Sequence, residues 1–308
     1  LDTTVQIMQY QGYMPIQASS PVLLTFVYGF LMTLGQHLGG NNLGLFFCVL
    51  FQVALGLYAL SFGCEEAASR SGKKYIGLIL SLFFGLAMVY PSLAQGALKD
   101  AVYSPLFLLL VIFYCRTLED GSKKNLIPLV ILALLCGATR KGGMYLSALI
   151  LLCLACQKNL RRFAVISCLT LVAVHGVVNW AIYPAVGIES PDEKENYSFF
   201  YQLTGYYCSN HPDWVTEEEK RIISQVLDYD TVVTKYNSKV VDEIKSTYHA
   251  DNAAQVRSYL LLQGKLFLKH PLTMLEAVVY ARNWSFCPFI WEVEKFIGEV
   301  QIGFDYVD

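Results

Sequence analysis

Residues Leu43–Gly63 read LGLFFCVLFQVALGLYALSFG, a run of twenty-one residues without one charged side chain. A helix of about 20 apolar residues crosses the roughly 30 Å hydrocarbon core of a bilayer. Lipid offers no hydrogen-bond partners to a backbone, so a segment of this kind must be helical. The stretch therefore predicts a transmembrane helix.

Further apolar segments follow at short intervals. They are Ile76–Ala94, Tyr103–Cys115, Leu126–Cys136 with an extension to about Thr139, Met144–Cys156 and Phe163–Pro184. The middle three are short for a span, so we expect them to tilt little or to end below the membrane surface and leave a wet cavity. The pattern predicts an all-α fold, a polytopic membrane bundle of about six helices over residues 43–185.

The segment Pro21–Leu38 admits two placements. It is apolar enough to span, but a span here would put the start of the chain on the inner side. It could instead lie in the outer interface, with Gly39–Asn42 as the turn into the first span. We favour the interfacial placement, in part because of the resemblance described below, and treat residues 1–42 as an extracytoplasmic first-loop segment.

Composition divides the chain into two parts. Of its 308 residues 55% are hydrophobic and only 16% charged, whereas soluble domains carry about a quarter charged residues. Residues 1–185 hold twelve Lys/Arg and six Asp/Glu, and residues 186–308 hold eleven and nineteen. A basic apolar part followed by an acidic polar part predicts two environments. No basic face of the kind that binds nucleic acid is present.

The second part, residues 186–308, carries helix signals. Ser190–Glu193 and Thr216–Glu219 fit the capping box, with a hydroxyl as N-cap and Glu three residues later. Two further helices are expected over Ala254–Lys269 and Pro271–Arg282, and strand signals are nearly absent. We predict a small helical domain.

Loop charges predict the orientation. Loops 64–75, 116–125 and 157–162 hold nine Lys/Arg, whereas the alternate loops hold only Lys99, Arg140 and Lys141. The positive-inside rule puts the nine-charge set in the cytoplasm. We therefore expect a multi-pass protein of the cell membrane with residues 1–42 and 186–308 outside. Because the chain begins without Met, we also expect it to be a fragment cut at both ends.

One candidate site lies at the start of the chain. Asp2, Gln6 and Gln9 have i, i+4 and i+7 spacing and so share a helical face. A carboxylate with two amides could serve as general base and hydroxyl-orienting groups for a sugar or an alcohol. The alternative is the polar face of an interfacial helix.

Charges between the apolar runs give a second candidate. Lys99 and Asp100 lie near membrane depth, where ionisable groups are costly and tend to be paired or functional. Arg140 and Lys141 precede two glycines, and this combination suits a lipid-linked phosphate or pyrophosphate. The alternatives are a solvated pair in an ordinary loop and a hairpin tip that touches headgroup phosphates.

The order of these features resembles that of a known group of proteins. An Asp-x-x-x-Gln-x-x-Gln segment precedes Ser19–Thr25, then come Lys99-Asp100, Arg140–Tyr145 and the polar stretch from Thr216. This resembles a largely uncharacterised family of bacterial multi-spanning proteins that look like GT-C type glycosyltransferases. Two departures are Ser19-Ser20, where histidines are common, and Lys141-Gly142, where asparagine is expected.

The resemblance implies transfer of a sugar from a polyprenyl-phosphate donor to a cell-envelope glycan or lipid acceptor on the outer membrane face. Asp2 matches the catalytic acidic position of the first external loop. Arg140, Lys141 and Lys99 would stabilise the departing phosphate, and Asp100 would hold Lys99 or contact the sugar. The scheme needs no metal or other cofactor, although a divalent ion at Asp2 is an alternative. The competing functions are a transporter or flippase and a non-catalytic scaffold of envelope assembly.

Overall fold

The structure, a computed structural model, describes residues 2–87, 96–120, 123–238 and 240–281, apart from the side chains of Asp2, Asp120, Lys123 and Lys141. Within these residues the chain forms two compact units, 2–191 and 192–281. Each unit has its own hydrophobic core. The fold of the described residues is all-α, as predicted, and their sole β feature is an isolated bridge between Gln17 and Glu189.

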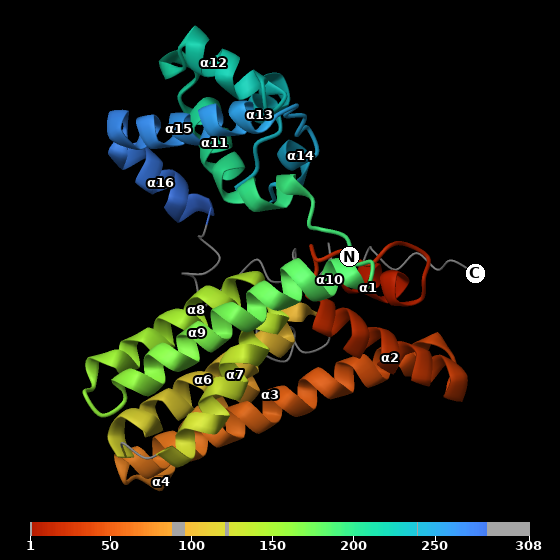
Figure 1. Cartoon of the computed structure of the whole chain (residues 1–308), viewed down its shortest axis with the longest axis vertical. Helices are drawn as coiled ribbons and strands as arrows, with labels where there is room; N and C mark the ends of the chain where they lie inside the picture. The colour runs from red at the N-terminus through yellow and green to blue at the C-terminus, as the bar shows by residue number, and fades with distance from the viewer. Residues whose placement is uncertain (1, 88–95, 121–122, 239, 282–308) are drawn as a thin grey trace. The chain divides into compact units, whose positions relative to one another are not determined.

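The first unit is a bundle of helices, several of which are joined by short turns (Figure 1). Short 3-10 turns at Lys123–Asn125 and Leu154–Cys156 and a π-helical turn at Val178–Ile182 join some of the helices. The helices are α1 (Asp2–Tyr10), α2 (Val22–Gly39), α3 (Asn41–Ser71), α4 (Lys74–Leu86), α6 (Lys99–Asp120), α7 (Leu126–Thr139), α8 (Lys141–Cys153), α9 (Arg161–Val177) and α10 (Tyr183–Ala185).

The outward faces of this bundle are those of a membrane protein. Side chains such as Leu78, Ile127 and Leu169 are exposed by 62%, 70% and 64%, a surface that suits contact with lipid. Four described stretches are long and apolar enough to cross a membrane: Val22–Gly39, Asn41–Ser71, Lys99–Glu119 and Arg161–Ala185.

Some helix boundaries differ from the predicted ones. The helix at Leu126–Thr139 has the expected bounds, but α3 and α6 are longer, with 31 and 22 residues, so Tyr103–Cys115 is not a short span. Most of the expected loops 64–75 and 116–125 is helical. The apolar run ends at the first charged residue, and a prediction from hydropathy ends there too. The helix continues, because the charged side chains that follow have partners within the bundle.

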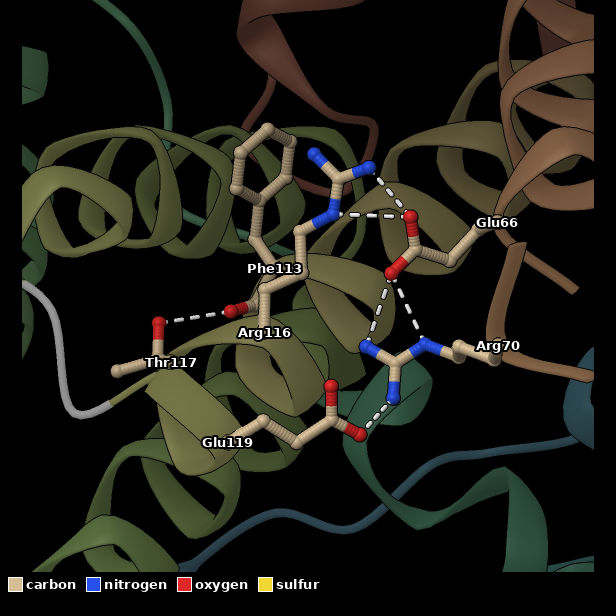
Figure 2. A network of polar contacts seen from close by, with 6 residues as sticks. All are labelled: Glu66, Arg70, Phe113, Arg116, Thr117 and Glu119. Carbon is tan, nitrogen blue, oxygen red and sulfur yellow. Dashed lines mark hydrogen bonds and ion pairs between the residues drawn. The ribbon is translucent and has the colours of Figure 1, made fainter. Parts of the chain in front are cut away.

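Glu66 is the partner of these charges near the C-terminal ends of α3 and α6 (Figure 2). Its carboxylate accepts hydrogen bonds from the guanidinium groups of Arg70 and Arg116, with 2.9 Å from each Nε, and Arg70 also pairs with Glu119. The guanidinium of Arg116 lies 4.6 Å from the centroid of the Phe62 ring. A buried or half-buried charge is tolerated near membrane depth when it is paired in this way.

Helices α2 and α3 form a hairpin that turns at Gly40, whose φ of 99° lies in the region that favours glycine. A Cβ built on Gly35 would lie 2.2 Å from the backbone of Gly44, so both glycines allow the helices to approach closely. The sequence favours an interfacial placement for Pro21–Leu38. The observed helix packs along α3, and its length and composition are compatible with either placement.

The second unit packs short helices around a central one (Figure 1). Residues 201–208 of α11 are all buried. The other helices form the same core around it. In order, the helices are α11 (Ser198–Asn210), α12 (Glu217–Ser224), α13 (Tyr229–Thr234), α14 (Asp242–Lys245), α15 (Ala253–Lys269) and α16 (Pro271–Ala281).

One of the two predicted capping boxes is present. The Thr216 hydroxyl accepts from the Glu219 amide, and the Glu219 carboxylate accepts from the Thr216 amide. The first prediction was wrong, because Asp192 rather than Ser190 caps a 3-10 turn, Glu193–Tyr197. Helices α15 and α16 match their predicted ranges to within one residue over the described part of the chain.

Candidate functional site

Two of the predicted polar pairs meet in the first unit. Arg140 lies between α7 and α8 with extended backbone angles, and Asp100 lies in the first turn of α6. The Arg140 Nη1 atom is 2.8 Å from the Asp100 Oδ1 atom. The same guanidinium lies 5.3 Å from the ring centroid of Tyr103, one turn along α6. Sequence reasoning proposes Lys99 or the sugar as the partner of Asp100, whereas the observed ion pair is with Arg140.

Gly143 explains how the α7–α8 corner reaches α6. A Cβ at this position would lie 2.2 Å from the Cys136 carbonyl oxygen and 2.8 Å from a ring carbon of Tyr103. Gly142 has open space instead, with nothing within 4 Å of an added methyl group. From the sequence, both glycines are predicted to let the backbone come close to a ligand. The structure gives Gly143 a packing role that positions Arg140 against Asp100.

A buried polar network holds the segment that leads into α6. The Tyr28 hydroxyl lies 3.0 Å from the carbonyl oxygen of Leu98 and 3.2 Å from Gln52 Oε1, and its single proton is shared between these two acceptors. The Gln52 side chain also accepts from the Leu98 amide and donates to the Gly96 carbonyl. Both side chains are at most 2% exposed. They satisfy backbone groups just before Lys99 and Asp100 and so fix where α6 begins.

Helix α1 joins the same region. The Thr3 hydroxyl donates to the Ala97 carbonyl, so the start of α1 lies beside the segment that precedes α6. Gln6 and Gln9 are 0% and 3% exposed, which argues against a solvated polar face. Gln6 Nε2 donates to the Pro21 carbonyl at 3.4 Å, and the Oε1 atoms of both glutamines are buried without a partner. Such acceptors are costly unless something donates to them.

A pocket of about 110 Å³ opens beside Arg140. Its walls come from the start of α2, from α7 and from α9 with its π-helical turn. An adjoining hollow of about 480 Å³ shares the walls at His175, Asn179 and Tyr183. The polar groups of the first pocket are supplied by Ser20, Arg140, His175, Asn179 and Tyr183. None of these except Arg140 was predicted from the sequence.

The turn in α9 shapes this wall. Val178–Ile182 is π-helical, a conformation that is rare and frequent at functional sites. The Asn179 side chain donates to the His175 carbonyl at 2.8 Å, which satisfies a backbone group near the widened turn. No Gly or Pro lies within Val178–Ile182, so the sequence does not predict the π-helical turn.

The helix lengths set the depth of the site. Helix α7 has 14 residues and rises about 21 Å, whereas a hydrocarbon core is about 30 Å thick. The corner with Arg140 therefore ends short of one membrane face, or the bilayer thins around it.

The structure thus brings together Asp100 and Arg140, and it places Thr3 beside Ala97, two residues before Lys99 in the chain. Lys99 begins α6 and is partly buried. The side chains of Asp2 and Lys141 lie outside the described residues. In the described part of the chain, three or more His, Cys, Asp or Glu side chains do not gather in the way that metal ligands do.

Comparison with known proteins adds a family. Residues 15–281 match DUF6020, a family of unknown function. The chain belongs to this family. The DUF6020 match covers the pocket, the Arg140–Asp100 pair and the described part of the second unit, and it begins after α1. No curated protein and no solved structure matches the chain. The shared family therefore gives no activity, and the function must be argued from the site.

Proposed function

We propose that this protein transfers a sugar from a polyprenyl-phosphate donor to a cell-envelope acceptor on the outer face of the cell membrane, as its resemblance to GT-C type glycosyltransferases implies. The observation that carries the proposal is the position of Arg140. This side chain is paired with Asp100 and lines a pocket between apolar helices. A cation of that kind suits a phosphate on a lipid chain, because guanidinium bonds phosphate and the surrounding surface is apolar.

The donor phosphate binds at Arg140 in this scheme, with Lys141 and Lys99 adding charge. Asp100 orients the guanidinium from one side and leaves its remaining N–H groups for the ligand. The polyprenyl chain extends into lipid along the exposed apolar faces of the helices. The position of Arg140 at a helix end supports this arrangement, since the phosphate of a membrane-anchored donor lies near the headgroups.

The acceptor binds at α1. The Oε1 atoms of Gln6 and Gln9 have no partner but are buried, so acceptor hydroxyls reach them in this scheme only when α1 shifts. Asp2 takes the proton of the attacking hydroxyl while the acceptor oxygen bonds to the anomeric carbon. The bond from that carbon to the phosphate oxygen breaks, and polyprenyl phosphate leaves with the electron pair. The cations stabilise its negative charge.

Two rival functions predict other arrangements. A transporter or flippase places charges and broken helices at the bilayer midplane, on a path through the protein. Asp100 and Arg140 instead occupy helix ends. A non-catalytic scaffold predicts scattered polar clusters, whereas Thr3, Asp100 and Arg140 converge on one end of the bundle. These observations favour the transferase.

The test is sugar transfer in proteoliposomes with a panel of polyprenyl-phosphate sugars and envelope-derived acceptors. The wild-type protein should transfer one of these sugars, and Asp2→Asn and Arg140→Ala should each lose roughly 100-fold or more in rate. Lys74→Ala, at the other end of the bundle, is the matched cation control and should retain activity. Equal rates for the wild type and both site variants would contradict the mechanism, and lipid translocation without transfer would favour the flippase.

A further inference from the structure

The second unit carries apolar side chains where a water-soluble domain would have polar ones. On α15, Leu261 and Leu268 are 59% and 87% exposed. On α16, Leu272, Leu275 and Val279 are 76%, 55% and 55% exposed. Single exposed leucines are ordinary, but stripes of this kind mark a surface that something covers.

The spacing makes each set one helical face. Positions 261 and 268 are seven apart, and positions 272, 275 and 279 follow i, i+3, i+7, so each set forms a stripe. Leu268 and Leu272 flank the corner at His270, where the two helices meet. The opposite faces are already used, because Leu266 and Met274 are fully buried in the core of the unit. The outer stripes are therefore not needed to hold the unit together.

Charge distinguishes this face from the rest of the unit. Residues 192–252 hold twelve Asp/Glu and six Lys/Arg, whereas residues 253–281 hold Arg257, Lys265 and Lys269 against the single acid Glu276. Arg257 and Lys265 are exposed, and Lys265 lies between Leu261 and Leu268 on the same stripe. Long cationic side chains beside apolar ones suit an interface in which the stem contacts lipid and the charge reaches phosphate.

We propose that the α15–α16 face rests on the surface of the bilayer in which the first unit is embedded. The leucines enter the boundary between headgroups and acyl chains, and Arg257 and Lys265 contact lipid phosphates. The unit follows the apolar stretch Arg161–Ala185 after a few residues, so the chain itself keeps it at high local concentration near the membrane.

The occupant is lipid rather than a protein partner for two reasons. Most of the second unit is acidic, and the stripes lie in a net-basic segment, which complements anionic lipid. The chain also holds the second unit near a bilayer, without a further component. The inference does not depend on the proposed transferase activity.

The test uses the full chain in liposomes of phosphatidylcholine with phosphatidylglycerol. A benzophenone photocrosslinking amino acid replaces Leu272 in one variant and Leu275 in a second. It replaces Glu218, an exposed residue of α12, in the control. After illumination, mass spectrometry should find phospholipid adducts at positions 272 and 275, at least fivefold above position 218. Crosslinks to another segment of the protein or to a second copy, or an absence of lipid adducts at both positions, would overturn the proposal.

A charge variant tests the headgroup contact. Arg257→Glu with Lys265→Glu, in the Leu272 photocrosslinking background, should reduce adducts with phosphatidylglycerol severalfold. Adducts in liposomes of phosphatidylcholine alone should change less. An unchanged yield of phosphatidylglycerol adducts would refute the role of these cations. Circular dichroism of both proteins ensures that the comparison is between folded chains.

Discussion

Arg140 and Asp100, from different helical hairpins, are joined by an ion pair of 2.8 Å between Nη1 and Oδ1. The two side chains are 47% and 52% exposed. Ion pairs of such exposure contribute only about 0–1 kcal/mol to stability. The ion pair therefore contributes little to the stability of the fold. Its consequence is to fix the direction of a guanidinium group at the mouth of a pocket.

Asp100→Asn tests this distinction between positioning and stability. The amide keeps the shape of the side chain but loses the charge that orients Arg140. We expect the free energy of unfolding to change by less than about 1 kcal/mol. Sugar transfer should fall severalfold, with the loss mainly in the maximal rate. Thermal unfolding in detergent and transfer assays measure the two quantities, and a large loss of stability with normal transfer would reverse the interpretation.

Gly143→Ala should disturb the corner that carries Arg140. The added methyl would lie 2.2 Å from the Cys136 carbonyl oxygen, and overpacking of this kind costs about 1–3 kcal/mol. Gly142→Ala is the matched control, because its methyl meets nothing within 4 Å and alanine favours a helix. A lower melting temperature for the first variant and an equal or higher one for the second are expected. Equal melting temperatures would count against the packing role of Gly143.

Tyr28→Phe should loosen the start of α6. The change removes one hydroxyl that bonds both Leu98 and Gln52 in a buried network. We expect a loss of about 1–2 kcal/mol, since a buried acceptor is left unsatisfied. Tyr58→Phe, where the side chain is 60% exposed, should be nearly neutral. Melting temperatures of the two variants in the same detergent provide the comparison, and similar values would argue against the network.

Acid should weaken the capping box of α12. Burial raises the pKa of Glu219, but the Thr216 amide and the Lys269 ammonium, 3.1 Å away, outweigh burial and lower it below its ordinary value. A depressed pKa means that the carboxylate stabilises the folded state above about pH 4.5, and that this contribution disappears as the pH falls through the lowered value. Hydrogen exchange at the α12 amides should accelerate there in the wild type. In Glu219→Gln this step should be absent, and its persistence would exclude Glu219 as the cause.

Much of the fold could be predicted from the sequence, because lipid imposes a simple rule on an apolar segment. Leu126–Thr139 was predicted with its observed bounds, and Thr216 and Glu219 with their reciprocal bonds. The ends of α3 and α6 could not be predicted. Their helical continuation depends on pairing between Glu66 and Arg116, which belong to different helices. Hydropathy contains no information about such partners.

The site was predictable only in part. Charges such as Asp100 and Arg140 stood out against apolar surroundings, but their pairing required the three-dimensional arrangement. Gln52 interrupts the apolar run that decides the fold, and a polar residue at membrane depth was the available signal for the network with Tyr28. His175 had no distinctive spacing, and only the structure shows that it lines the pocket.

Binding of the donor phosphate at Arg140 tests the central claim most directly. The protein in nanodiscs is titrated with a polyprenyl phosphate, and native mass spectrometry measures the bound fraction for the wild type, Arg140→Ala and Lys74→Ala. A charged hydrogen bond contributes about 1.5–3 kcal/mol, so Arg140→Ala should weaken binding at least tenfold, whereas Lys74→Ala should match the wild type. Equal affinity for all three proteins would contradict the proposed site.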